Sequence, residues 1–515
     1  MHKICVHLRE SALRQAQFMF KIQYSKFHVR RSMFPDLYRD STFDLSKLLF
    51  LALLTIVLLG GCSKKQPSIN LGEIYNRSAM SHPIDRNPVI LIPGITGSRL
   101  VDSESGTVVW GTFGSKGLNP NTPLGMELFG VPMKQGVPLN RLTDSVVADS
   151  VLDNVEIGLA GLSFNLKAYY NIVSILGAGM YIDYDIATQG DNVDYGGEHY
   201  TCFQFAYDWR LSLDENARRL DNFIKEQSVF VQQQIEQNYG IKNYDVKFDL
   251  VAHSMGGLLS RYFLRYGSAP VEAVDPTAPV PWTGTQHVDR LIMVGTPNAG
   301  SVEAVINFVD GMIVAPIFPK FSPTLVGSIP AVYQLLPRNR HKRVVDADQP
   351  EVTIDLYDPE VWIQNQWGLA QTDNDALLKI MLPNTRSPEE RKAVALDHLT
   401  KSLKKAEAIA EALDRPASPP ETTSIHLFAG DAIDTPATLA IDSKGNYSVY
   451  KTEHGDGTVV RSSALLDERI AQEWQPRLQT PIEFDDVNFI FESHLGLTKD
   501  KSFSDNLLFL LLEQN

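Results

Sequence analysis

The chain has 515 residues, with 47 Lys and Arg against 61 Asp and Glu, and therefore a net charge of −14 at pH 7. Hydrophobic residues make up 43% and charged residues 21%, a balance that excludes a disordered chain, a collagen-like fibre and a polytopic membrane protein. The acidic excess argues against a nucleic-acid partner, because phosphate binding needs a basic surface. The 3 cysteines are too few for a disulfide framework.

Residues 1–61 have the pattern of a bacterial lipoprotein signal peptide. The apolar run Leu48–Gly61 is too short to span a bilayer of about 30 Å, but it has the length of a signal-peptide core. It ends in Leu59–Cys62, which resembles a lipobox, where the cysteine sulfur takes a diacylglyceryl group and the cysteine becomes the mature N-terminus. A buried helix or a short signal anchor is the alternative. We expect a lipid-anchored tether over 62–86 and a location at the outer membrane or the periplasmic face of a bacterial membrane.

Short apolar runs alternate with helical patterns after the tether. Amphipathic spacing predicts helices over 213–238 and 256–266, and the C-terminal run 507–514 predicts a helix end. The apolar runs predict buried strands at 88–93, 201–206, 246–252, 288–294 and 425–429. The alternation predicts an α/β fold, with a mostly parallel sheet and helices on both faces.

Two segments interrupt this alternation. Residues 111–140 are dense in Gly and Pro, and we expect a lid loop there. Residues 301–423 are far longer than one crossover needs and contain a predicted helix at 399–413, so we expect an inserted cap. The sheet core is therefore predicted in two parts, 87–300 and 424–515.

The segment Ala252–Gly257 carries the predicted nucleophile. It lies between a predicted strand and a predicted helix, and it matches the nucleophile elbow G-x-S-x-G apart from Ala in place of the first Gly. The elbow exposes the hydroxyl of Ser254 in a strained turn, and its flanking positions must be small because strand and helix nearly touch. The alternative is an ordinary turn in which Ser254 caps the helix.

In this arrangement an acid and then a histidine follow the serine in the chain. His494 follows the apolar run 487–491 in a turn, where its ring could reach the serine, whereas His426 lies inside an apolar strand and is expected in the core. Asp456 is flanked by glycines on a predicted tight turn. Asp431 is the rival acid, and an ordinary turn aspartate is the alternative for Asp456.

An oxyanion hole needs two N–H donors beside the serine. One is expected from Met255, the residue after the nucleophile. The other is expected from the glycine-containing loop Pro93–Gly97, which follows the first predicted strand.

Taken together, the motifs resemble the lecithin:cholesterol acyltransferase family, with its lysosomal phospholipase and phospholipid:diacylglycerol acyltransferase relatives. The motifs that carry the resemblance are 93–98, 207–211, 252–257, 455–459 and 493–494, in the family's order. The resemblance implies an α/β-hydrolase fold with a cap and a lid, and a triad of Ser254, Asp456 and His494, which favours Asp456 over Asp431. By position it also makes Thr96 the second oxyanion donor. Animal members close their lid with a disulfide, for which this chain has no cysteines.

Three further residues are candidates for substrate binding. Trp110 could line an acyl site, although an ordinary buried Trp is an equal alternative. Asp208 and Arg210 are two residues apart and could orient a lipid head group, but such pairs more often brace a loop.

The sequence thus predicts a serine acyl-ester enzyme, an O-acyltransferase or a phospholipase A on phospholipid, with a possible alcohol or sterol acceptor. The alternatives are a carboxylesterase for soluble esters and an inactive lipoprotein used for binding. No metal or cofactor is expected, because the sequence has no Cys/His cluster, EF-hand spacing or phosphate loop.

Overall fold

The computed structural model describes most of the chain after the predicted tether. The described residues are 78–79, 86–112, 117–152, 155–159, 162–166, 169–189, 200–314, 318–472 and 475–513. The predicted signal peptide and Cys62 lie outside them. Among these residues, no helix is both long enough and apolar enough to cross a membrane.

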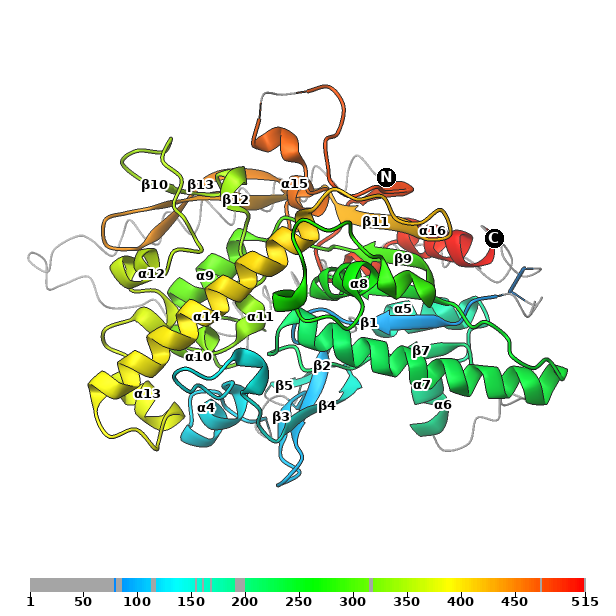
Figure 1. Ribbon diagram of the computed structural model, residues 1–515, viewed down its shortest axis with the longest axis horizontal. Helices are drawn as coiled ribbons and strands as arrows, with labels where there is room; N and C mark the ends of the chain where they lie inside the picture. The colour runs from blue at the N-terminus through cyan, green and yellow to red at the C-terminus, as the bar shows by residue number, and fades with distance from the viewer. Residues whose placement is uncertain are drawn as a thin grey trace, which may run out of the picture. The chain divides into compact units, whose positions relative to one another are not determined.

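A parallel sheet forms the centre of the described part (Figure 1). Its six strands have the spatial order β14 (Asp486–Ile490), β11 (Ser424–Gly430), β9 (Val288–Val294), β8 (Phe248–His253), β1 (Val89–Ile92) and β7 (Cys202–Gln204). The inner strands β1 and β8 are buried along their whole length, as a sheet covered on both faces requires. The predicted strands are therefore confirmed.

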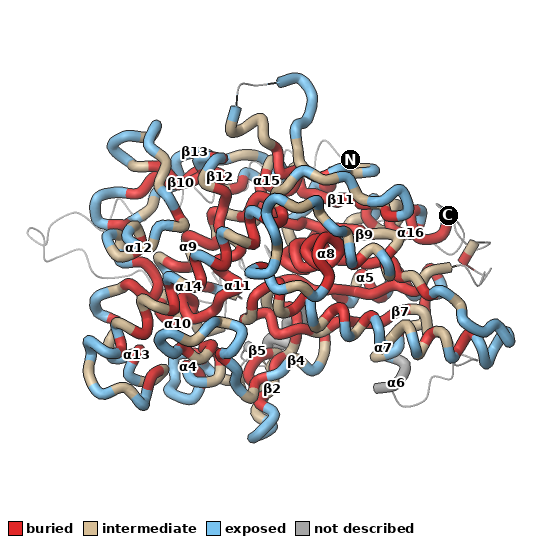
Figure 2. The backbone as a smooth tube through the Cα atoms, in the orientation of Figure 1, coloured by how far each residue is buried: buried red, intermediate tan, exposed pale blue. Residues whose placement is uncertain are grey.

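Alternate residues of each strand enter two separate apolar cores. Ile90 and Ile92 belong to the core that includes α7 (Leu213–Tyr239) and α8 (Met255–Tyr266). Val89 and Leu91 belong to the other core, which includes α5 (Tyr170–Ala178) and α16 (Lys501–Leu512). Helices therefore cover both faces, and every residue of α8 is buried (Figure 2).

The strand order places a switch point beside β1. The chain passes from β1 to β7 on one side and then returns to β8 on the other side of β1. In open parallel sheets, ligands bind at the carboxyl ends of the strands where the order reverses. The predicted elbow follows β8 and the predicted oxyanion loop follows β1, so both leave the sheet at this point. This is the α/β-hydrolase fold that the sequence predicts.

Residues 301–423 form mainly helices beside the sheet. They are α9 (Val302–Asp310), α10 (Pro323–Gly327), α11 (Pro330–Tyr333), η5 (Asn339–His341), α12 (Pro359–Asn365), η6 (Gly368–Ala370), α13 (Asp375–Met381) and α14 (Pro388–Asp414), with strand β10 (Val344–Asp346). The helix predicted at 399–413 is the second half of α14, which begins earlier because Ser387 caps it by accepting from Glu390 N–H. The domain boundaries remain a prediction.

Smaller sheets surround the centre. They are β3 (Val108–Trp110), β2 (Ser98–Asp102) and β4 (Val146–Val151); β5 (Val155–Leu159) and β6 (Leu162–Leu166); and β10 with β12 (Ile433–Ile441) and β13 (Tyr447–Gly455). The remaining elements are α6 (Tyr184–Gln189), α15 (Arg461–Ala464), η2 (Leu139–Arg141), η3 (Val271–Ala273), η4 (Thr283–Gln286), η7 (Glu468–Ile470) and η8 (Leu497–Lys499).

The predicted lid segment contains helix α4 (Pro123–Phe129), and residues 113–116 of it lie outside the described residues. Phe129 is fully buried, and its ring packs edge-on against Trp110 and Phe321. The second half of the predicted lid segment is therefore packed between the core and the cap segment. Lid motion remains a prediction.

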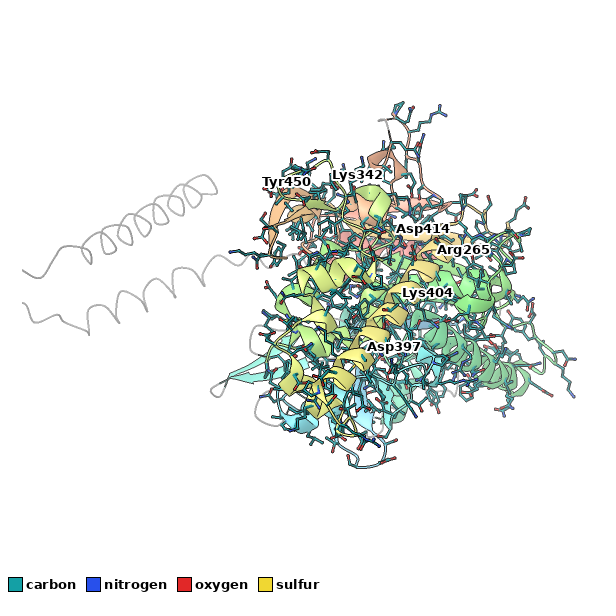
Figure 3. All side chains as sticks on the ribbon, turned by 60° about the vertical axis from the view of Figure 1, so that its left-hand side comes forward. Arg265, Lys342, Asp397, Lys404, Asp414 and Tyr450 are labelled. Atoms are coloured by element: carbon teal, nitrogen blue, oxygen red, sulfur yellow. The ribbon has the colours of Figure 1, made fainter. Side chains whose placement is uncertain are left out.

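Helix α8 binds the end of α14. Arg261 Nη2 donates to the Leu413 carbonyl over 2.7 Å, and the Tyr266 hydroxyl donates to the Ala412 carbonyl over 2.9 Å. The last carbonyls of a helix have no N–H donor within the helix and carry partial negative charge, so these donors stabilise the helix end. Figure 3 labels Arg265 and Asp414 close together at this junction. The helix after Ser254 is thus fixed to the longest helix of the cap segment.

Asp414 is the charged centre of this junction. Its carboxylate lies 2.7 Å from Arg338 Nε and 2.7 Å from Arg340 Nη1. Burial raises the pKa of Asp414, but the two guanidinium groups outweigh burial and hold its pKa below the usual value.

We expect Asp414→Asn to lower the free energy of unfolding by about 3 kcal/mol at pH 7, because Arg338 is left buried without a counter-charge. Since the folded pKa lies below the unfolded one, this stabilisation is present at neutral pH and is lost as the pH falls below about 4. Denaturant midpoints at several pH values measure both effects. Asp397→Asn, on the same helix, removes a partly exposed pair with Lys401 and should cost under about 1 kcal/mol. Equal midpoints for the two variants at pH 7 would contradict the prediction.

Candidate active site

Ser254 lies in a strained turn between β8 and α8. Its backbone has φ +54° and ψ −123°, a left-handed conformation that is costly for a residue other than glycine. A Cβ on Gly256 would lie 2.5 Å from the Pro93 carbonyl oxygen, and one on Gly257 would overlap the Thr296 side chain. The small residues after the serine are therefore required by close packing, as the elbow motif predicts.

The structure brings Ser254, His494 and Asp456 together from distant parts of the chain. His494 Nε2 lies 3.0 Å from Ser254 Oγ, and His494 Nδ1 lies 2.7 Å from Asp456 Oδ2. The peptide N–H of His494 also donates to the Asp456 carbonyl oxygen over 2.9 Å. The histidine is thus fixed through both its ring and its backbone.

Asp456 is held as an ionised acceptor. Its second oxygen, Oδ1, accepts the backbone N–H groups of Thr458 and Val459 over 2.9 and 2.7 Å. Burial by itself raises the pKa of this carboxyl, but the His494 ring and these N–H donors outweigh burial, so the pKa lies below its usual value. A charged Asp456 keeps the proton of His494 on Nδ1 and leaves Nε2 to accept from Ser254.

The rival acid Asp431 and three other histidines that follow Ser254 in the chain have different partners. Asp431 pairs with Arg461, with 3.1 Å between Oδ2 and Nη1. His341 contacts Glu468, His398 contacts the Ser328 carbonyl, and His426 contacts Asp486 and Ser424. In the part of the chain that the structure describes, no three His, Cys, Asp or Glu side chains could hold a metal ion together.

The loop after β1 lies directly against the serine. A Cβ on Gly94 would be 2.8 Å from Ser254 Cβ. The loop turns back at Thr96, which has φ +61°, and Gly97 N–H donates to the Gly94 carbonyl over 3.1 Å. Met255 occupies the first position of α8, where backbone N–H groups have no acceptor within the helix. Thr96 and Met255 therefore stand on the two backbone segments that meet at Ser254, while their role as oxyanion donors remains a prediction.

Trp110 supports this loop. Its ring is buried, and its Nε1 donates to the Thr96 carbonyl over 2.7 Å. The ring packs edge-on against Trp209 and Phe318. Trp110 thus has a structural contact to the loop, and its predicted place in an acyl site remains a prediction.

Asp208 and Arg210 form a buried brace. Arg210 is fully buried, and its guanidinium bonds to both carboxylate oxygens of Asp208 and of Asp144 and to the Leu128 carbonyl. Every nitrogen of this guanidinium is engaged within the protein. The pair thus makes the contacts of the bracing alternative, and its contact with a lipid head group remains a prediction.

Two residues at the site were not singled out from the sequence. Tyr169, the residue before α5, has its hydroxyl 2.8 Å from Gly94 N and 3.2 Å from His253 Nδ1. The second is His253, and its position directly before the predicted nucleophile was a signal in the sequence that could have marked it. Nothing local marks Tyr169, because only the folded chain brings it to the elbow.

The comparisons with known proteins agree with the motifs. The family described as "Lecithin:cholesterol acyltransferase" matches residues 187–411, which include Ser254 but neither Asp456 nor His494. No curated protein sequence matches the chain.

Solved structures with a similar fold have low sequence identity. A chain of the Tle4–Tli4 complex aligns with 83% of this chain and 98% of its own, at 16% identity and a TM-score of 0.49. The mature lipase BlEst2 from Bacillus licheniformis aligns with 84% of this chain and 95% of its own, at 14% identity and a TM-score of 0.31. Lipase 1 from Pelosinus fermentans aligns with 83% of this chain and 99% of its own, at 14% identity and a TM-score of 0.30.

The family match covers the elbow and the buried brace, two of the motifs on which the resemblance rests. The resemblance to the lecithin:cholesterol acyltransferase family is thus confirmed over residues 187–411.

Proposed function

We propose that the protein is a serine enzyme for acyl esters of lipids, which hydrolyses phospholipids or transfers their acyl chains to an alcohol. The observation that carries this proposal is the His494 ring, which is hydrogen-bonded to Ser254 on one side and to a buried, ionised Asp456 on the other. The family match supports lipid esters as the substrate class, because the family's description names a phospholipid and a sterol.

The proposed reaction begins with attack of Ser254 Oγ on the ester carbonyl carbon. His494 Nε2 takes the hydroxyl proton, and Asp456 stabilises the resulting imidazolium. The negative charge on the former carbonyl oxygen is received by the N–H groups of Met255 and Thr96. The tetrahedral intermediate collapses, His494 returns its proton to the leaving alcohol, and an acyl-enzyme on Ser254 remains.

The second half of the reaction decides the product. Water, deprotonated by His494, releases a fatty acid, and an alcohol or sterol in the same position yields a new ester. The triad is the same in both cases, so the choice depends on which acceptor reaches the acyl-enzyme. We propose both phospholipase A and O-acyltransferase activity on this basis.

We further propose that Cys62 anchors the enzyme to a bacterial membrane, at the outer membrane or on the periplasmic face. The lipobox-like Leu59–Cys62 after a short apolar run supports this location. Two ester-linked acyl chains and one amide-linked chain would hold the protein stably at a lipid surface, close to its substrate.

The chemistry is tested by Ser254→Ala. We expect acyl release from phospholipid vesicles to fall by about 10³-fold or more, because the nucleophile is lost. Mass spectrometry of the acyl products, with and without a long-chain alcohol, measures hydrolysis and transfer separately. Ser260→Ala is the matched control, since Ser260 is a buried serine of α8 and its hydroxyl donates to the Gly256 carbonyl. Activity that survives in Ser254→Ala would overturn the proposal.

The contact between the oxyanion loop and the serine is tested by Gly94→Ala. The added Cβ would press against Ser254, so we expect kcat on a short soluble ester to fall by about 10-fold or more. Gly177→Ala is the control, because a Cβ there meets no atom within 4 Å and the residue lies in helix α5. An unchanged kcat in Gly94→Ala would mean that the loop does not contribute to catalysis.

The anchor is tested by Cys62→Ala in a bacterial host that processes lipoproteins. The wild type should fractionate with membranes and carry acyl chains by intact-mass measurement, and the variant should carry none. Cys202→Ala should keep the acyl chains, because Cys202 is buried in β7. An unmodified Cys62 in the membrane-bound wild type would contradict this proposal.

A further inference from the structure

The Tyr169 side chain lies under the loop after β1. Its hydroxyl oxygen accepts the Gly94 N–H over 2.8 Å. A Cβ on Gly97 would lie 2.7 Å from the same oxygen, so the phenol touches both ends of the turn that contains Thr96. Tyr169 is buried, and burial raises its pKa, so the phenol keeps its proton.

The phenolic proton of Tyr169 determines which ring nitrogen of His253 carries a proton. The phenolic oxygen receives the Gly94 N–H, and its own O–H points to His253 Nδ1 over 3.2 Å. Nδ1 must therefore be an acceptor, which assigns the ring proton to Nε2. Nε2–H then donates to the His494 carbonyl oxygen over 3.3 Å.

His253 also has to remain uncharged beside the imidazolium that the proposed reaction forms. The two histidine rings lie 4.9 Å apart between centroids. Burial, reinforced by the nearby His494, lowers the pKa of His253 to about 3, so the ring stays neutral near physiological pH. A neutral ring can hold the His494 peptide without repelling the charged His494 side chain.

We propose that Tyr169 and His253 are positioning residues, which act as one unit to hold the loop after β1 and the His494 peptide in register with Ser254. This inference rests on the proposed function. The hydrogen bonds run from Gly94 N–H to Tyr169, from Tyr169 to His253, and from His253 to His494. The unit thus connects the proposed oxyanion loop to the proposed base through the residue beside the nucleophile.

The first test is kinetic and uses Tyr169→Phe on a short soluble ester. The variant leaves Gly94 N–H and His253 Nδ1 without partners, so we expect kcat to fall by about 10- to 100-fold with KM within about 2-fold. Tyr181→Phe is the matched control, because Tyr181 is buried in the same apolar core and its hydroxyl donates to the Leu511 carbonyl. Equal kcat values for these two variants would overturn the proposal.

Further variants test whether the two residues act as one unit. His253→Leu should lose as much activity as Tyr169→Phe, and the double variant should be little worse than the worse single one. His253→Gln keeps a donor near the Nε2 position and should recover part of the loss. Losses that multiply in the double variant, or no recovery in His253→Gln, would mean that the residues act separately.

The second test does not depend on activity. Nitrogen-15 NMR of histidine-labelled protein, with His253 assigned through His253→Gln, should show a neutral ring with its proton on Nε2 between pH 5 and pH 8. Tyr169→Phe should shift the Nδ1 signal of His253. A proton on Nδ1, or a ring that titrates in this range, would overturn the inference. Ser254→Ala on the same ester separates the two proposals. Full activity of this variant would contradict the proposed function, and the NMR result would still test whether Tyr169 and His253 act as one unit.

Discussion

The left-handed turn at Ser254 is the constraint on which the rest of the site depends. A backbone at φ +54° is costly for serine and is kept only where the surrounding chain holds it. Here the end of β1 presses against the turn from one side, and Gly94 and Gly256 leave room for that contact. The hydroxyl is thereby fixed at the carboxyl edge of the sheet, where the strand order reverses beside β1.

The turn is useful only because two later segments meet it. Asp456 follows β13 and His494 follows β14, and backbone hydrogen bonds as well as side chains join the two residues. The helix that begins at Met255 in turn binds the last carbonyls of α14 through Arg261 and Tyr266. The elbow is thus held between the C-terminal loops and the cap segment.

The sequence predicted the central sheet well and its surroundings poorly. The inner strands of the parallel sheet are mostly buried, so each contains a short apolar run, and α7 and α8 have clear amphipathic spacing. The β12–β13 hairpin was missed because β13 is exposed along most of its length and carries no apolar pattern, while Pro436 lies at a register shift of β12. The first half of α14 was also missed, since its first turn, Glu389–Lys392, is charged throughout.

The sequence by itself determined the nucleophile candidate, the order of the motifs and the resemblance to one family, because each depends on residues that are neighbours in the chain. The local pattern left Asp456 and Asp431 as rival acids, since both follow strand-like segments next to glycine, and the family resemblance alone favoured Asp456. Tertiary structure separates them: Asp431 pairs with Arg461, and Asp456 contacts His494, 38 residues further along. Tertiary structure also decided the contact between Tyr169 and His253, which are 84 residues apart, and the burial of Arg210. Which distant side chains meet depends on how the strands and helices pack, and no local pattern records it.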